Sequence, residues 1–217
     1  MTDRRGRLIL VLLVGLAWGC GDDDVIGPEP DPYLPLTSPE NILHDLEASW
    51  ERRDILRYAE LLDPEFRFYF QQLDVPPGLP LAYWNRDEDS TGTGALLASP
   101  EVKEIHVDLG PFTVEDAGRV DYPGARRVRL TQARLEVALA NDITLVVEGD
   151  TQDMIFRRGS AAAGSDSTRW YLLEWSDIPG GGGFKRQPAA AEPAAGLAAR
   201  SPLVESNSWG RIKALFR

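Results

Sequence analysis

Two stretches of the chain place apolar residues at helical spacing. The first begins at Ser38 and Pro39, which suit the cap and the first position of a helix. Its apolar stripe consists of Ile42, Leu43, Leu46 and Trp50. Asp54 can cap the second stretch. This stretch ends at Asp63-Pro64, because proline disfavours helical geometry in the residue before it. The pattern therefore predicts two consecutive short helices.

Directly after these helices the apolar period changes to two. The first alternating residues are Phe66, Phe68 and Phe70. Later segments with the same period are EIHVDL, RVRLTQARLEVAL, ITLVVEGDTQDMIF and RWYLLEWSD. The apolar phase shifts by one residue near Thr131-Gln132 and again near Gly149, as an extra residue in a strand would cause. We therefore expect long strands with a β-bulge at each shift and a turn at 140–142.

A loop and a third helix separate the first strand from the others. VPPGLPLAYW reads as a loop because of its prolines and glycine, and NRDEDSTGTGALLAS reads as a helix that ends near Ser99-Pro100. The chain thus runs helix, helix, strand, helix and then antiparallel strands. This order predicts an α+β fold in which a curved antiparallel sheet wraps around the N-terminal helices.

The N-terminus has the pattern of an export signal. Arg4, Arg5 and Arg7 precede an apolar run from Leu8 to Trp18. As a helix this run rises only about 16 Å, whereas a bilayer core is roughly 30 Å thick. Cys20, the one cysteine of the chain, follows in LAWGC. A lone cysteine excludes an internal disulfide, so we expect the fold to depend on packing.

This segment resembles a bacterial lipoprotein signal, in which the cysteine becomes the lipidated N-terminus. The resemblance implies a membrane anchor at Cys20 and a location in the cell envelope, with the inner and outer membranes both open. The sequence departs from the pattern where leucine is usual, since Ala17 lies three residues before the cysteine and Leu16 lies one further back. The alternative is an incidental cysteine beside an ordinary cleavage site.

The composition divides the chain into five segments. Residues 1–19 form the signal, and residues 20–37 form an acidic, proline-rich and disordered tether. Residues 38–178 form the folded domain, and residues 179–207 form a Gly/Ala/Pro-rich linker. Residues 208–217 carry an apolar stripe that predicts a short amphipathic helix. Fraying of this helix, docking on the domain and contact with a partner or membrane all stay open.

The net charge of the chain indicates which classes of partner it can bind. The chain of 217 residues has a formal net charge of -11, and without residues 1–19 the charge is -13. Such a surface repels phosphate backbones, and no basic stripe with interleaved aromatic residues occurs, so we expect no nucleic-acid partner. The two histidines leave little material for a metal centre. Neither a metal nor a cofactor is therefore expected, and the oligomeric state stays open.

The stretch SPENILHDLEASWERRDILRYAELLDPEFRFYF, together with the closing RWYLLEWSD, resembles the nuclear transport factor 2-like superfamily over residues 38–178. The resemblance extends to its SnoaL-like and ketosteroid isomerase-like branches and is one of pattern and order. It implies a cone in which sheet and helices enclose a pocket. Some members bind small apolar molecules there, and others catalyse isomerisation, dehydration or epoxide opening. The resemblance suggests a cavity and does not establish an enzyme.

The residues that match the isomerase site are apolar in this chain. The proton-transferring aspartate of the isomerase-like members would fall at Phe70, and their tyrosine would fall at Leu46. A hydrocarbon side chain cannot accept a proton, so that mechanism is absent in this register. The remaining acid–base candidates are His106, Glu148 and Glu174, provided that they face the pocket.

Two further patterns favour ordinary structural roles. Asp87, Asp89 and Thr91 resemble the start of a calcium loop, but the position that should carry a bidentate glutamate is Ala98. A solvated acidic helix start is the preferred interpretation. His44 lies beside the apolar stripe of the first helix, where an edge residue is expected more often than a ligand.

The sequence favours a non-catalytic cone domain that binds a small apolar ligand or a protein partner. We expect the following residues to pack under the helices or line the pocket: Trp50, Tyr58, Phe66, Phe68, Phe70, Tyr83 and Trp84. Two alternatives remain. One is a SnoaL-like enzyme of the isomerase or dehydratase type with a non-standard acid–base pair, and the other is an interaction subunit that uses its C-terminal helix.

Overall fold

The computed structural model describes residues 31–75, 83–179, 203–206 and 208–217. The predicted signal, Cys20 and most of the predicted tether lie outside the described residues, as does most of the predicted linker. Residues 31–217 make up one compact unit, to which everything below refers. No helix in the described part of the chain has the length and apolar composition needed to cross a membrane.

Helices α1 (Pro39–Glu51) and α2 (Ile55–Leu61) begin at the predicted residues. The Ser38 hydroxyl accepts a hydrogen bond from the Asn41 N–H at 3.3 Å, and Asp54 accepts one from the Arg57 N–H at 2.9 Å. These caps satisfy N–H groups that a helix start leaves without a partner. Both helix starts are confirmed.

The domain begins earlier than predicted. Leu36, which falls in the predicted tether, is buried, and its carbonyl accepts a hydrogen bond from the Trp170 N–H at 2.8 Å. The Tyr33 hydroxyl donates to Asp54 at 2.8 Å. Composition alone misplaced this boundary, because a proline-rich segment can still pack where its few apolar side chains meet the core.

Helix α3 (Arg86–Ala98) is the predicted third helix, and a capping box of Asn85 and Glu88 starts it. Arg53 stabilises its end. The Arg53 guanidinium donates to the carbonyls of Leu97 at 2.5 Å, Ser99 at 2.6 Å and Val102 at 3.0 Å. The turn between α1 and α2 is thereby tied to the last turn of α3.

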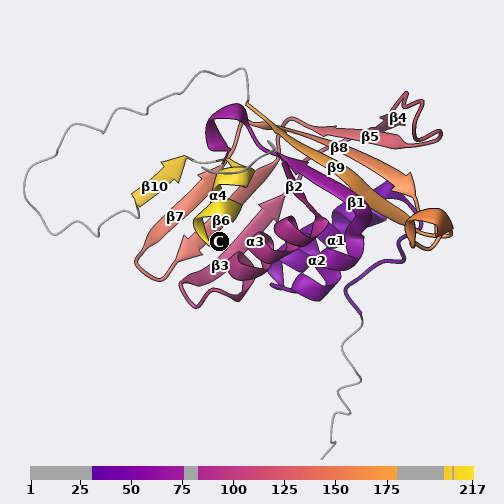
Figure 1. Ribbon diagram of the computed structural model, residues 1–217. Helices are drawn as coiled ribbons and strands as arrows, with labels where there is room; N and C mark the ends of the chain where they lie inside the picture. Colours follow the sequence, from indigo (N-terminus) through magenta and orange to yellow (C-terminus); the bar gives the residue numbers. More distant parts are fainter. Residues whose placement is uncertain (1–30, 76–82, 180–202, 207) are drawn as a thin grey trace, which may run out of the picture. The chain divides into compact units, whose positions relative to one another are not determined.

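In the described part of the chain, ten strands form two sheets (Figure 1). The first sheet has, in spatial order, β2 (Tyr83–Asn85), β1 (Leu62–Tyr69), β9 (Trp170–Ile178), β8 (Thr151–Arg158), β5 (Arg126–Leu130) and β4 (Val114–Asp116). The second has β10 (Leu203–Ser206), β7 (Ile143–Val147), β6 (Arg134–Leu139) and β3 (Val102–Asp108). Short 3₁₀ turns η1 (Gln72–Asp74) and η2 (Ala161–Ala163) complete the elements before the C-terminal helix.

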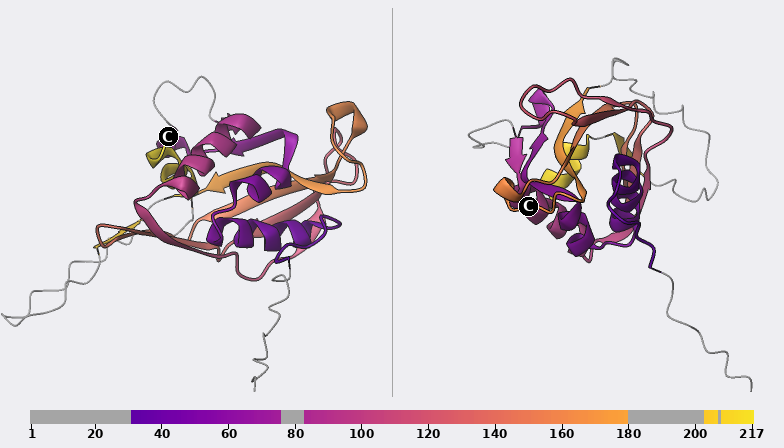
Figure 2. Two further views of the ribbon diagram at one scale, coloured as in Figure 1. Left: turned by 90° about the horizontal axis from the view of Figure 1, so that it is seen from below. Right: turned by 90° about the vertical axis from the view of Figure 1, so that its right-hand side faces the viewer.

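The fold class is confirmed as α+β, with the helices against a curved sheet (Figure 2). The pairing differs from the expectation in two places. β1 pairs with β9 in parallel, and β10 pairs with β7 in parallel, so the sheets are mixed. Both parallel pairs join strands that lie far apart in the sequence, and alternation within a strand contains no information on which distant strand it meets.

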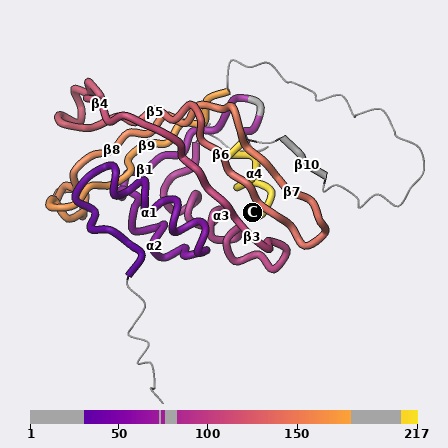
Figure 3. The backbone as a smooth tube through the Cα atoms, turned by 180° about the vertical axis from the view of Figure 1, so that it is seen from behind, coloured from indigo at the N-terminus to yellow at the C-terminus, as the bar shows by residue number. Residues whose placement is uncertain are grey.

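The two predicted bulges mark the points where the chain leaves one sheet for the other. β5 ends at Leu130 and β6 begins at Arg134, while β7 ends at Val147 and β8 begins at Thr151 (Figure 3). Gly149 adopts a left-handed conformation with φ of +81° between β7 and β8. The shifts in apolar phase were correctly located, and each is a break between strands of different sheets.

The C-terminal helix α4 (Trp209–Leu215) is part of the domain interior. Ser208 caps it by accepting a hydrogen bond from the Arg211 N–H at 3.0 Å. Trp209 and Ile212 are fully buried, whereas Arg211 is exposed. Of the alternatives that the sequence left open for this segment, the structure has the helix docked on the domain.

Candidate functional site

The interior of the cone contains most of the residues predicted to line a pocket. Six of them are buried: Trp50, Tyr58, Phe66, Phe68, Phe70 and Trp84. Phe68 and Phe70 meet edge to face with ring centroids 5.2 Å apart, and Phe70 and Trp84 do so at 4.8 Å. Tyr83 differs, since it is half-buried and lies against Tyr69.

Helix α4 occupies this interior. The ring of Trp209 lies 5.4 Å from Trp50 and 5.1 Å from Trp175, measured between centroids. Gly210 lies so close to Phe70 that a Cβ atom added to the glycine would be 2.6 Å from the phenyl ring. The groove between helices and sheet is therefore filled by the chain itself, and the fit at Gly210 leaves no space for a side chain.

A buried ion pair lies at the centre of this interior. The Lys213 ammonium is 2.7 Å from Asp89 Oδ1, and it also donates to the Tyr58 hydroxyl at 3.1 Å. The Tyr58 hydroxyl donates in turn to Asp89 Oδ2 at 2.5 Å. All three residues have no exposed surface. Every charged atom is thus paired or hydrogen-bonded, as burial of a charge requires.

Burial dominates the electrostatics of this group. It lowers the pKa of Lys213 below its usual value, and the Asp89 carboxylate acts in the opposite direction. Burial and the same carboxylate raise the pKa of Tyr58 well above its usual value, so the tyrosine stays a neutral hydroxyl that donates to Asp89. The group is one cation, one anion and one neutral donor.

Four aromatic rings surround the Lys213 ammonium, and we refer to them as the aromatic cage: Trp50, Tyr58, Phe68 and Trp175. The nitrogen lies 4.0 Å from the ring centroid of Phe68 and 4.3 Å from that of Trp175. The centroids of Tyr58 and Trp50 are 5.6 Å and 5.7 Å away. These distances lie within the roughly 6 Å over which a ring attracts a cation.

Asp177 holds the first turn of α4. Its Oδ2 accepts a hydrogen bond from the Gly210 N–H at 3.0 Å, and its Oδ1 accepts from Gln71 at 3.1 Å and Gln152 at 2.9 Å. Burial raises the pKa of Asp177 above its usual value, although these hydrogen bonds oppose the rise. The carboxyl group thus connects α4 to the end of β9.

Several polar atoms in this interior lack a partner. Among the described residues, the indole N–H groups of Trp50, Trp84 and Trp209 are buried without a hydrogen bond. A buried donor left unpaired costs about 1–3 kcal/mol. The docked α4 therefore fits the interior by shape and charge while leaving hydrogen-bonding capacity unused.

The three acid–base candidates do not lie in this interior. His106 is exposed on β3 and lies 2.9 Å from Glu51. Glu148 is exposed between β7 and β8, and Glu174 pairs with Arg119 at 3.0 Å. They lie on separate surfaces and form no common site. His44 is half-exposed beside Asp45 on α1, as expected for an edge residue.

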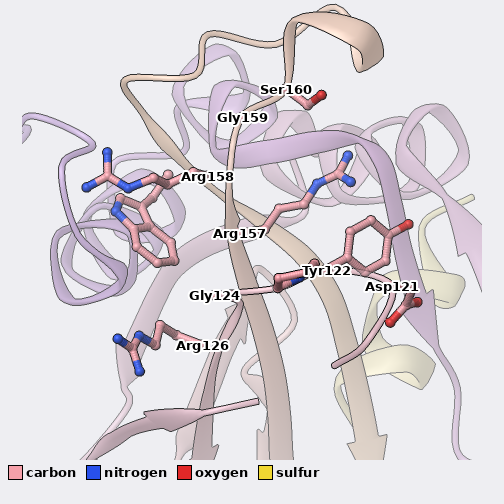
Figure 4. Close-up of a pocket in the computed structure, with 10 residues that line it drawn as sticks. Asp121, Tyr122, Gly124, Arg126, Arg157, Arg158, Gly159 and Ser160 are labelled. Carbon is pink, nitrogen blue, oxygen red and sulfur yellow. The ribbon is translucent and has the colours of Figure 1, made fainter. Parts of the chain in front are cut away.

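A surface hollow lies where β5, β8 and the loop at 121–124 meet. Its lining includes three arginines, Arg126, Arg157 and Arg158. Figure 4 shows Arg126 and Arg158 directed to one side of the strand and Arg157 directed to the other. Arg157 is also engaged by Asp63. The guanidinium groups do not converge, so we do not assign an anion site to this hollow.

The residues that resembled a calcium loop form part of a helix. Asp87 and Thr91 are exposed on α3, and Asp89 faces inward to Lys213. Within the described residues, no group of three or more histidine, cysteine, aspartate or glutamate side chains is arranged to hold a metal ion.

Sequence reasoning missed Asp89 and Lys213 as a pair. A signal was nevertheless present in each helix. Lys213 lies four residues after Trp209, and Asp89 lies four residues before Thr93, so each charge falls in the buried phase of its helix. Two opposite charges in the buried phases of two helices predict a contact between those helices.

Comparisons with known proteins concern the fold alone. No family model matches the chain, and no curated protein matches it. Among solved structures, the chain is similar to a nuclear transport factor 2-like superfamily protein from Salmonella enterica, with 11% identity, a TM-score of 0.47 and coverage of 67% of this chain and 91% of that one.

Two further structures are similar to a comparable degree. One is an NTF2-like protein of unknown function from Pseudomonas putida, with 8% identity, a TM-score of 0.43 and coverage of 64% of this chain and 82% of that one. The other is Aln2 from a Streptomyces species, with 14% identity, a TM-score of 0.46 and coverage of 66% and 93%. At such identities no activity follows for this chain.

Substitution of Gly210 tests how tightly α4 is held. In Gly210→Ala the new methyl group would overlap Phe70, so we expect a loss of about 1–3 kcal/mol in the free energy of docking α4. Hydrogen exchange of the α4 amides should accelerate accordingly. Arg211→Ala, on the exposed side of the same helix, is the matched control and should leave exchange unchanged. Unchanged exchange in Gly210→Ala would contradict this packing.

Proposed function

We propose that this chain is a lipid-anchored binding protein of the bacterial envelope. Its cone domain binds a small apolar ligand in the interior, performs no catalysis, and carries α4 as a resident occupant of the binding site. The observation that supports this most is the docking of α4 in an aromatic groove built by the rest of the domain.

The composition of the groove supports a ligand with a large apolar surface. Its walls come from α1, β1, β9 and β2, through Trp50, Phe68, Trp175 and Trp84. None of these walls belongs to α4, so the groove persists as a surface when the helix leaves. The unpaired indole N–H groups of Trp50 and Trp84 stay with the walls and supply two hydrogen-bond donors that α4 does not use.

The position of the acid–base candidates supports a binding role over a catalytic one. General acid–base chemistry needs the group within hydrogen-bond reach of the reacting atoms. His106 and Glu148 are exposed, and Glu174 is partly buried and paired with Arg119, so none of the three is grouped with the interior residues. A SnoaL-like enzyme would have to use other residues, and turnover of a small organic substrate by the full chain would favour that alternative.

The binding proposal is tested with an uncharged fluorescent probe, prodan, titrated into the full chain. Bound ligand must displace α4, so the apparent affinity is the intrinsic affinity multiplied by the fraction of molecules in which the helix is released. We expect Gly210→Ala to bind the probe about 5- to 150-fold more tightly than the wild type, as 1–3 kcal/mol of weaker docking implies. Arg211→Ala should bind as the wild type does. Absence of saturable binding in all three proteins would overturn the proposal.

The anchor is tested separately, in bacteria that produce the chain from Met1. We expect the wild type in the membrane fraction and Cys20→Ser in the soluble exported fraction, since acyl chains at Cys20 would hold the protein at the membrane. Mass spectrometry of the mature N-terminus identifies the acyl chains. An unmodified Cys20 would remove the anchor and leave the binding proposal in place.

A further inference from the structure

We propose that the aromatic cage is a recognition site for an organic ammonium, and that the ligand of the interior is an amine with an aromatic body. In the structure, Lys213 occupies the place of the ammonium group and Trp209 occupies the place of the aromatic body. This inference rests on the proposed function, which it deepens by naming the class of ligand.

The cage is complete without α4. Trp50 comes from α1, Tyr58 from α2, Phe68 from β1 and Trp175 from β9, and the carboxylate of Asp89 comes from α3. Only the cation comes from the C-terminal helix. The rest of the domain thus supplies the walls and the counter-ion, and the seven-residue helix α4 supplies the cation. The domain is arranged as a binding site, and α4 occupies it as a ligand would.

The chemistry of the cage selects a cation. The rings of Phe68 and Trp175, the two nearest to the nitrogen, attract positive charge, the Tyr58 hydroxyl accepts a hydrogen bond from it, and Asp89 supplies a full negative charge at 2.7 Å. A carboxylate or phosphate ligand would meet Asp89 with the same sign of charge. A neutral ligand can fill the apolar part of the interior but supplies no counter-ion for that carboxylate, so it binds more weakly than an amine of similar size.

The geometry favours an ammonium over a guanidinium. The Lys213 nitrogen uses two hydrogen-bond acceptors, Asp89 Oδ1 and the Tyr58 hydroxyl, which a compact group with several donors matches. The Tyr58 O–H already donates a hydrogen bond to Asp89, so its oxygen can accept one from the ammonium. A planar fork with five donors would find too few acceptors here.

Trp209 indicates what the rest of the ligand resembles. Its indole packs between Trp50 and Trp175 at interplanar angles of 68° and 58°, and both of these walls also belong to the cage. Trp209 and Lys213 are four residues apart on one helix and therefore share a face. The interior thus holds an aromatic ring beside an ammonium, and an arylalkylamine presents the same pair of groups in one small molecule.

Displacement of α4 is physically accessible. A helix of seven residues is not stable in water by itself, so it persists only through docking. The docked state leaves the indole N–H of Trp209 unpaired, which weakens it. An amine that pairs with Asp89 replaces the ion pair that the departing Lys213 breaks, whereas a neutral ligand does not.

The first experiment uses the full wild-type chain with phenethylammonium and its neutral counterpart 2-phenylethanol. Hydrogen exchange of residues 208–217, measured by mass spectrometry, reports release of α4. We expect the amine to accelerate exchange at a concentration about tenfold or more below that needed for the alcohol, because the charge-assisted hydrogen bond and the ring faces favour the cation. Equal potency of the two compounds would overturn the inference.

The second experiment uses Lys213→Ala in the full chain, which removes the cation and leaves Asp89 in place. n-Propylammonium should raise the melting temperature of this variant, whereas 1-propanol should not. In Lys213→Ala combined with Asp89→Asn, the advantage of the amine should disappear. If Lys213→Ala does not fold, the wild-type experiment alone decides. An amine advantage that survives Asp89→Asn would also overturn the inference.

The outcomes separate the two proposals. If the wild type and Gly210→Ala bind prodan, but amines have no advantage over alcohols, the interior is a binding site and the ammonium inference fails. If neither prodan nor any amine binds, the proposed function fails with it, and α4 is a permanent part of the core.

Discussion

Lys213→Met is expected to lower the free energy of unfolding by about 3–5 kcal/mol, the cost of leaving one partner of a buried ion pair without the other. Methionine retains the length of the apolar stem, so the change removes the charge and little packing. Asp89 then stays fully buried and, among the described residues, keeps only the Tyr58 hydroxyl as a side-chain hydrogen-bond partner. Urea unfolding of the wild type and the variant measures the difference.

Release of α4 limits this loss. Once the helix leaves, Asp89 regains contact with water, so the penalty cannot exceed the free energy that docking provides. We therefore expect Lys213→Met to show rapid hydrogen exchange in α4 before the sheets unfold. An undiminished free energy of unfolding, with slow exchange in α4, would contradict the buried pair.

Two further variants test whether the loss of stability comes from the unpaired buried charge of Asp89 or from removal of a lysine in general. Asp89→Asn combined with Lys213→Met removes both charges and should recover most of the loss, since no unpaired charge remains. Lys103→Met breaks an exposed Lys–Asp pair of 3.2 Å with Asp142 and should change stability by less than about 1 kcal/mol. The contrast isolates burial, because the two pairs have the same chemistry.

The parts of the fold that follow from local pattern were predictable. Ser38 and Asp54 mark helix starts because a short polar side chain bonds N–H groups a few residues away. The inward face of β1 follows from alternation, which sends Phe66 and Phe68 to the same side of the strand. In each case the interaction that determines the element joins residues only a few positions apart, so the local sequence pattern is enough to predict it.

The parts that depend on distant contacts were not predictable from pattern alone. Lys213 and Asp89 are 124 residues apart, and the basic residues near the C-terminus also fit a solvent-exposed helix end. The parallel pairing of β1 with β9 likewise joins opposite ends of the domain. The candidate site was therefore predicted in part. Its aromatic walls were identified from the sequence, whereas its occupant and its ion pair depend on where α4 docks.

Asp63→Ala is expected to lower the free energy of unfolding by about 3–5 kcal/mol. The strands of the first sheet should be destabilised together. Asp63 on β1 has no exposed surface and accepts two hydrogen bonds from Arg157 on β8, at 2.8 Å and 2.5 Å. β9 lies between these strands, so the pair ties together two strands that are not neighbours. Removal of the carboxylate leaves a nearly buried guanidinium whose one remaining side-chain hydrogen-bond partner among the described residues is Glu65.

Glu65→Gln is the matched control for this pair. Glu65 also accepts a hydrogen bond from Arg157, at 2.6 Å, but its side chain is 53% exposed, so water replaces the lost charge interaction. We expect a change below about 1 kcal/mol. Asp63→Ala should leave hydrogen exchange in α4 slow until the sheet unfolds, because Asp63 does not contact the interior occupant. Equal effects of Asp63→Ala and Glu65→Gln would show that burial of Asp63 contributes nothing, and rapid α4 exchange in Asp63→Ala would show that the sheet and the docked helix are coupled.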